Sequence, residues 1–168
     1  MNKPINILVT GCNGRMGKAI INCASNHSEV LISKGIDIGD SIDDYLDGCD
    51  VVIDFSTHAF TTELAEKCAS KDKSIVIGTT GHSDDELIAI KKSSVSIPIV
   101  MAPNFSVGVN TLFWLTKKTA EILGEDFDLE IIEMHHRQKI DAPSGTARRL
   151  GEILAESTGV SYSNDIMH

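Results

Sequence analysis

The sequence has few aromatic residues, a deficit of positive charge and no long apolar run. Aromatic residues make up 5% of the 168 positions, so aliphatic side chains must fill the core that a 42% hydrophobic content can form. A formal net charge of −9 argues against nucleic acid and anionic membrane surfaces as main partners. No apolar run approaches the roughly 18–20 residues that cross a bilayer, and no signal-peptide-like stretch opens the chain. We therefore expect a soluble, cytoplasmic protein with neither a nucleic-acid nor a membrane partner.

Cysteines are also few, and their placement argues against a disulfide framework. The four are scattered without a C-x-x-C spacing, as is typical of reduced thiols in a cytosol; they are Cys12, Cys23, Cys49 and Cys68. A metal site is not expected either. His135 and His136 are adjacent, so on a strand they point to opposite faces, and no cysteine lies near them in sequence.

The first segment of the chain predicts a nucleotide-binding turn. Residues 5–10 form a short apolar run typical of a buried parallel strand, a glycine-rich stretch follows at 11–17, and apolar residues then recur at helical spacing. The spacing is G-x-x-G-x-x-G, because Asn13 stands where the standard G-x-G-x-x-G motif has its second glycine. A tight strand-to-helix turn without a ligand therefore remains an alternative at this point.

An acidic residue strengthens the nucleotide interpretation. Asp37 ends the second predicted strand, residues 30–36, about 20 residues after the glycine turn, where an acidic residue binds the ribose hydroxyls of NAD. Ile38 follows, at a position where a site for NADP would more usefully carry an arginine. The alternative is that Asp37 only begins a polar loop. The pattern predicts a preference for NADH over NADPH.

Strands and helices alternate five times, which predicts a parallel, doubly wound sheet of the Rossmann type in an α/β protein. Further strands are expected at residues 50–55, 74–77 and 97–101, and Pro98 suggests an edge or early-strand position for the last of them. Ligands bind such sheets at the carboxyl ends of the strands. Three loops there are rich in glycine and small residues: 11–17, 78–81 and 102–105.

A second, partial domain is expected to follow. We assign residues 1–125 to the dinucleotide-binding domain and residues 126–168 to the start of an α+β substrate domain, with a strand at 127–135 and a helix from Ser144 to about Ser157. Ser144 is a natural N-cap. The N–H groups of Gly145 and Thr146 would then lie at the positive end of the helix dipole, where an anion binds.

The stretch from Glu130 to Ala147 carries two histidines, an arginine and a lysine ahead of a Pro-Ser-Gly-Thr turn. Together with G-C-N-G-R-M-G, I-D-F, G-T-T-G and N-F-S-V-G-V-N, in this order and spacing, it closely resembles the dihydrodipicolinate reductase family. The resemblance implies an NAD(P)H-dependent oxidoreductase of lysine and diaminopimelate biosynthesis. It also implies a small dicarboxylate substrate, and a homotetramer where the substrate domain is complete.

The resemblance also implies roles for individual residues. His135 and Lys139 would be the acid/base residues, and His136, Gly145 and Thr146 would hold the carboxylates of the substrate; without it, the histidine pair could equally be an exposed polar strand end. The residues expected to bind NADH (or NADPH) are Gly11, Cys12, Asn13, Gly14, Arg15, Met16, Asp37, Gly78, Thr79, Thr80, Ala102, Pro103, Asn104 and Phe105.

Enzymes of this family continue well beyond the length of this chain. We therefore expect either a fragment of a longer enzyme or a shortened product, with apolar surface exposed around residues 129–132. A non-catalytic, nucleotide-binding remnant of the family is the alternative function. Another amino-acid dehydrogenase with the same nucleotide fold is a third, which the paired histidines and the Pro-Ser-Gly-Thr turn disfavour.

Overall fold

The computed structural model describes residues 3–135, 137 and 142–162. The chain divides into two compact units, residues 1–102 and 103–168, each of which is described by itself. Among the described residues, no helix is long and apolar enough to cross a membrane.

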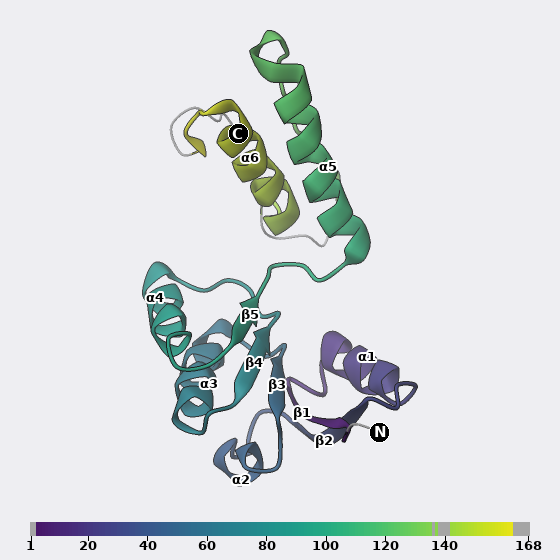
Figure 1. The fold of residues 1–168 in the computed structure, drawn as a ribbon, viewed down its shortest axis with the longest axis vertical. Helices are drawn as coiled ribbons and strands as arrows, with labels where there is room; N and C mark the ends of the chain where they lie inside the picture. Colours follow the sequence, from purple (N-terminus) through teal and green to yellow (C-terminus); the bar gives the residue numbers. More distant parts are fainter. Residues whose placement is uncertain (1–2, 136, 138–141, 163–168) are drawn as a thin grey trace. The chain divides into compact units, whose positions relative to one another are not determined.

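The first unit is a five-stranded sheet with helices on both faces (Figure 1). All neighbouring strands pair in parallel, in the order β2-β1-β3-β4-β5. Helix α1 lies on one face, whereas α3 and α4 lie together on the other. The predicted α/β fold class is therefore confirmed. The elements are β1 (Ile5–Thr10), α1 (Arg15–Ala24), β2 (Val30–Ile36), α2 (Asp43–Leu46), β3 (Val51–Asp54), α3 (His58–Ser70), β4 (Ser74–Ile77), α4 (Asp84–Ser93) and β5 (Ile99–Met101).

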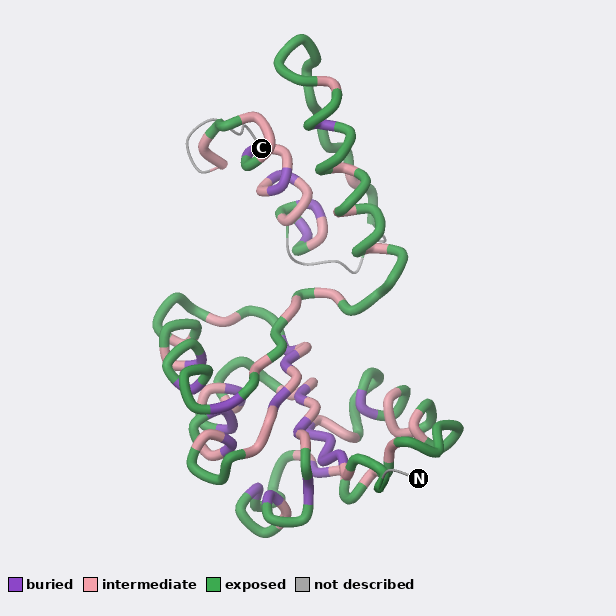
Figure 2. The backbone as a smooth tube through the Cα atoms, in the orientation of Figure 1, coloured by how far each residue is buried: buried purple, intermediate pink, exposed green. Residues whose placement is uncertain are grey.

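The core lies on the central strands (Figure 2). Leu8, Val52 and Ile75 of β1, β3 and β4 are almost completely buried, and Leu64 of α3 packs into the same cluster. Strand β5 forms one edge and is shorter than the predicted 97–101. Pro98 has no N–H group for the sheet, and only its carbonyl takes part, accepting a hydrogen bond from the N–H of Ile75 at 3.1 Å.

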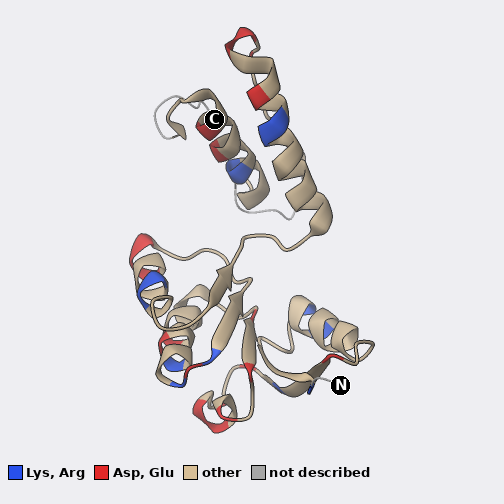
Figure 3. Ribbon diagram, viewed as in Figure 1, with Lys and Arg blue, Asp and Glu red and all other residues tan. Residues whose placement is uncertain are grey.

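Charge is unevenly distributed over the first unit. Acidic residues dominate α2 and its surroundings (Figure 3). Two of them pair with lysines at the end of α3: Asp43 with Lys67 of the helix at 2.7 Å, and Asp47 with Lys71, its C-cap, at 3.1 Å. These pairs are exposed, so they contribute little to the free energy of unfolding.

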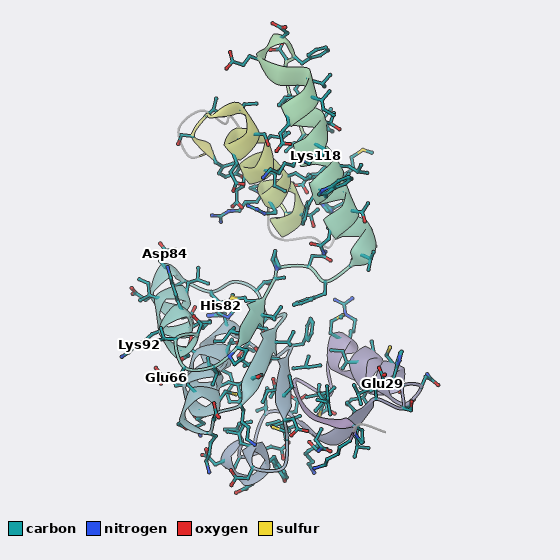
Figure 4. All side chains as sticks on the ribbon, in the orientation of Figure 1. Glu29, Glu66, His82, Asp84, Lys92 and Lys118 are labelled. Atoms are coloured by element: carbon teal, nitrogen blue, oxygen red, sulfur yellow. The ribbon has the colours of Figure 1, made fainter. Side chains whose placement is uncertain are left out.

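The second unit contains α5 (Val107–Leu123), a short 3-10 turn η1 (Gly124–Asp126) and α6 (Gly145–Thr158). Helix α5 packs mainly against α6. The half-exposed Lys118 of α5 pairs with Glu121 of the same helix at 2.7 Å (Figure 4). The division between the units therefore falls near residue 102, whereas the sequence suggested a boundary at 125, after α5.

One predicted element of the second unit is absent. Residues 127–135 are described and form no strand, so the prediction of a strand there is wrong. A strand is stable only when its N–H and C=O groups pair with a neighbouring strand, and the described part of this unit contains no strand with which residues 127–135 could pair. The predicted helix after Ser144 is confirmed as α6, which ends at Gly159 in the left-handed conformation that glycine favours.

Candidate cofactor and substrate sites

A cavity of about 410 Å³ lies at the carboxyl ends of β1, β2 and β3. Three predicted cofactor residues line it: Gly11, Gly14 and Asp37. The remaining wall comes from the ends of β1 and β2, the loops after β2 and β3, and the start of α3; its residues are Thr10, Ile36, Ile38, Gly39, Asp40, Phe55, Ser56, Thr57 and Phe60. The position agrees with the general rule that parallel sheets bind ligands at this end of their strands.

The glycine turn is held in a shape that only glycine permits at its first position. Gly11 has φ +70°, and a Cβ built there would lie 2.2 Å from the carbonyl oxygen of Phe55. At Gly17 a Cβ would lie 2.3 Å from the carbonyl oxygen of Gly11, so the first turn of α1 packs directly on the loop. A ligand in the cavity can therefore approach the backbone of the turn closely.

The start of α1 suits an anionic group. Gly14 caps the helix without a side-chain hydrogen bond, and the first turn contains no acidic residue. In the described part of the chain, the N–H groups of Arg15 and Met16 have no partner. Such N–H groups at the positive end of a helix dipole bind phosphate. The side chain of Cys12 faces elsewhere, because it packs against Gly35 of β2.

Asp37 connects the glycine turn with the loop after β2. One carboxylate oxygen accepts a hydrogen bond from the N–H of Asn13 at 2.8 Å, and the other accepts one from the N–H of Ile38 at 2.9 Å. These two bonds lower the pKa of Asp37 below its ordinary value, so the group is ionised at neutral pH. Asp40 adds a second carboxylate, which accepts from the N–H of Asp37 at 2.9 Å, while Ile38 is 98% exposed.

The loop after β4 does not line the cavity directly but contacts the ring of Phe55, which does. A Cβ at Gly78 would lie 2.2 Å from the Cζ atom of Phe55, so the ring packs on the bare backbone of Gly78. Phe55 itself lines the cavity. Thr79 is buried and Thr80 is exposed. Ala102 ends the first unit, and its N–H donates to the carbonyl oxygen of Ile77 at 3.2 Å.

Three predicted cofactor residues, Pro103, Asn104 and Phe105, open the second unit. The Asn104 side chain accepts a hydrogen bond from the N–H of Ser106 at 2.7 Å. The backbone carbonyl oxygen of Asn104 accepts a hydrogen bond from the side-chain amide of Asn110 at 3.0 Å. These bonds brace the chain entry into α5, whose N-cap is Ser106.

A second arrangement surrounds the start of α6. The Ser144 hydroxyl accepts a hydrogen bond from the N–H of Ala147 at 3.0 Å, which fixes the first turn. Among the described residues, the N–H groups of Gly145 and Thr146 have no partner. A Cβ at Gly145 would meet no atom within 4 Å, so the space beside this turn is open. The turn can therefore accept an anion such as a carboxylate.

Glu133 joins this turn to His135, a role that the sequence reasoning missed. Its carboxylate accepts from the N–H of Ser144 at 2.9 Å and contacts Nε2 of His135 at 2.6 Å. Hydrogen bonds from Ser144 and His135 lower the pKa of Glu133 to about 2. The sequence did contain a signal for this contact, because Glu133 and His135 are two residues apart, and such residues lie on the same side of an extended chain. His136 and Lys139, assigned to substrate and proton transfer, lie outside the described residues.

Comparison with known proteins identifies the family. The model for the N-terminal part of dihydrodipicolinate reductase matches residues 5–105, and the model for its C-terminal part matches residues 108–167. The chain belongs to the dihydrodipicolinate reductase family. Members of this family are oxidoreductases that use NAD(P)H. The resemblance inferred from the sequence motifs is therefore confirmed.

Individual dihydrodipicolinate reductases are similar over nearly the whole chain. The 4-hydroxy-tetrahydrodipicolinate reductase of Akkermansia muciniphila is 50% identical over 97% of this chain, and that of Geobacter metallireducens is 42% identical over 95%. These matches cover 66% and 68% of the two relatives, so the chain spans about two thirds of their length. A dipicolinate-bound dihydrodipicolinate reductase from Paenisporosarcina sp. TG-14 superposes with a TM-score of 0.75 at 26% identity, covering 99% of this chain and 70% of that one.

Proposed function

We propose that this chain carries the cofactor-binding and carboxylate-binding parts of a reductase that transfers hydride from NAD(P)H to 4-hydroxy-tetrahydrodipicolinate. The observation that carries the proposal is the cavity formed by the glycine turn and Asp37, in a chain that belongs to the dihydrodipicolinate reductase family. The product would be tetrahydrodipicolinate, in lysine and diaminopimelate biosynthesis.

The residues around the cavity fit a dinucleotide. The uncapped first turn of α1 would hold the pyrophosphate through the N–H groups of Arg15 and Met16. Asp37 would accept hydrogen bonds from the adenosine ribose hydroxyls. A nicotinamide cofactor supplies the hydride when bound, and the protein supplies orientation and charge.

The start of α6 fits a carboxylated substrate. Gly145 and Thr146 would donate their N–H groups to a carboxylate, and His136 would add a charge-assisted bond. Because Glu133 has a pKa of about 2, it is ionised at neutral pH and can only accept, so Nε2 of His135 must carry the proton between them. Nδ1 of His135 is then the ring nitrogen through which a proton can pass to the substrate. Lys139 would be the second group of this acid/base pair.

A stable dicarboxylate provides a direct test of the substrate site. Thr146→Pro removes one N–H group from the first turn of α6, where proline is tolerated in a helix. We expect calorimetry to show weaker binding of pyridine-2,6-dicarboxylate to this variant than to the wild type. Thr146→Ser keeps the N–H group and should bind normally. Equal binding by wild type and Thr146→Pro would remove α6 from the substrate site.

We also propose that the cofactor site prefers NADH to NADPH. The ionised Asp37 and the neighbouring Asp40 would repel a 2′-phosphate, and the exposed Ile38 offers no compensating cation. Fluorescence titration of the chain with both cofactors tests this. We expect tighter binding of NADH and a shift toward NADPH in Ile38→Arg. Tighter binding of NADPH to the wild type would refute the proposal.

A second candidate is cofactor binding without turnover. It is favoured by the segment 127–135, which forms no strand and exposes Ile132 at 86% and Met134 at 91%. The two candidates differ in one measurement, the oxidation of NADH in the presence of the substrate. A homotetramer, as the family resemblance implies, is proposed only for a complete substrate domain.

A further inference from the structure

A buried carboxylate lies beneath the cofactor cavity and has no role in the function proposed above. Asp54, the last residue of β3, has no exposed surface. In the described residues no cation pairs with it. A buried carboxylate is costly unless hydrogen bonds replace its lost water. Its partners therefore decide what the residue does.

The partners of the Asp54 carboxylate are four side-chain hydroxyls from four segments and one backbone N–H group. One carboxylate oxygen accepts from the hydroxyl of Thr10 at 2.5 Å and from both the hydroxyl and the N–H of Ser56, at 2.5 and 3.1 Å. The other oxygen accepts from the hydroxyl of Thr61 at 2.6 Å and from that of Thr79 at 2.8 Å. In all four of these hydroxyl contacts the hydroxyl donates, so its proton points toward the carboxylate. Each of these side chains is thereby held in one orientation.

Three of the four segments are the loops around the predicted cofactor site. Thr10 ends β1 and is followed directly by Gly11. Ser56 belongs to the loop after β3 and lines the cavity, and Thr79 lies in the loop after β4. The fourth partner, Thr61, is a buried residue of α3 that does not line the cavity. Thr10 is already paired with Asp54 in the sheet, whereas Ser56 and Thr79 lie beyond the ends of β3 and β4. The carboxylate therefore connects the end of β1 with two loops that lie beyond the strand pairing.

We propose that Asp54 is a positioning residue, whose buried carboxylate holds the loops after β1, β3 and β4 in the geometry that binds the nicotinamide cofactor. The inference rests on the proposed function for the identity of the ligand. Asp54 acts through Thr10, Ser56 and Thr79, and it does not itself touch the cofactor, since it has no exposed surface. The four hydroxyl contacts are short, 2.5–2.8 Å, and a buried polar group that loses such a bond is costly, which suits these bonds to this task.

Two threonines offer a matched pair for the test. Thr10 and Thr61 are 1% and 0% exposed and donate to the same carboxylate at 2.5 and 2.6 Å. Thr10→Val and Thr61→Val remove the same chemical group and keep the side-chain shape. Only Thr10 leads into the glycine turn. We expect both variants to lower the melting temperature, whereas Thr10→Val alone raises the Kd for NADH by about tenfold or more, with Thr61→Val within about twofold of the wild type.

A second measurement needs no ligand. Amide hydrogen exchange in the cofactor-free chain should become faster across residues 11–17 in Thr10→Val but not in Thr61→Val. Thr79→Val should accelerate exchange at residues 78–81, and Thr79→Ser, which keeps the hydroxyl, should restore it. Asp54→Asn should accelerate exchange in both loops. A loss of overall stability alone would accelerate exchange throughout the first unit. Faster exchange that is confined to one loop therefore reports a loss of order in that loop.

The outcomes separate the two proposals. If Thr10→Val and Thr61→Val raise the Kd for NADH and the exchange rates equally, Asp54 is a structural residue of the core and the inference is overturned. If the wild-type chain binds no NADH, the proposed function fails. The exchange contrast between the two threonine variants then still decides whether Asp54 orders these loops.

Discussion

Gly78 has no room for a side chain, and the atoms that would oppose one belong to the ring of Phe55. In Gly78→Ala the new Cβ would lie 2.2 Å from Cζ and 2.3 Å from Cε1 of that ring. Because real Cβ atoms do not approach so closely, the ring must move. Phe55 lines the cofactor cavity, so its displacement changes the wall of the predicted binding site.

The expected cost follows from overpacking. Inserting a methyl group into a packed site typically costs about 1–3 kcal/mol of the free energy of unfolding. For a chain of this size, each kcal/mol lowers the melting temperature by about 2–4 °C. We therefore expect Gly78→Ala to lower the melting temperature by several degrees and to weaken NADH binding. Differential scanning calorimetry and fluorescence titration measure the two effects.

Two further variants sharpen the interpretation. Gly108→Ala adds the same methyl group to α5, where the nearest atom is the hydroxyl of Ser106 at 3.7 Å, so NADH binding should not change. Phe55→Leu removes the ring, and Gly78→Ala should cost less in that background. If Gly78→Ala changed neither stability nor NADH binding, the contact between Gly78 and Phe55 would not shape the cavity.

Three other predictions concern the second unit. In a version with a complete substrate domain, Lys139→Ala and His135→Ala should each lower kcat by roughly 10²–10⁴-fold, whereas His136→Ala should mainly raise KM; a normal kcat for Lys139→Ala would reverse the assigned roles. The carboxyl group of Glu133, followed by carbon-13 NMR, should titrate near pH 2 and not near its ordinary 4.5; its contribution to stability is therefore present above pH 4.5 and lost as the pH falls through about 2, and titration at the ordinary value would show that its bonds do not form in solution. Ile132→Ser should reduce self-association of the 168-residue chain in sedimentation experiments, because Ile132 is 86% exposed, and unchanged association would show that another surface is responsible.

Much of the first unit could be predicted from local patterns alone. Strands β1, β2 and β4 have the predicted bounds. For β1 and β4 the reason is that a strand inside a parallel sheet is largely apolar, and that a glycine follows each of them. The capping box at the start of α4 was also readable, since it depends only on Ser83 and Glu86 three residues apart. Family membership followed from short motifs whose order and spacing belong to the sequence itself.

What the sequence could not supply were contacts between distant residues. Asp54 reads as the end of a strand, and only the parallel register brings its carboxylate to hydroxyls from β1, α3 and the loop after β4. The apolar run at 127–135 predicted a strand, yet strand formation requires a partner, and the described part of the second unit contains none. Local propensity thus determined the elements of this protein, whereas hydrogen-bond partners far apart in the chain decided which of them formed and what lies beneath the cofactor loops.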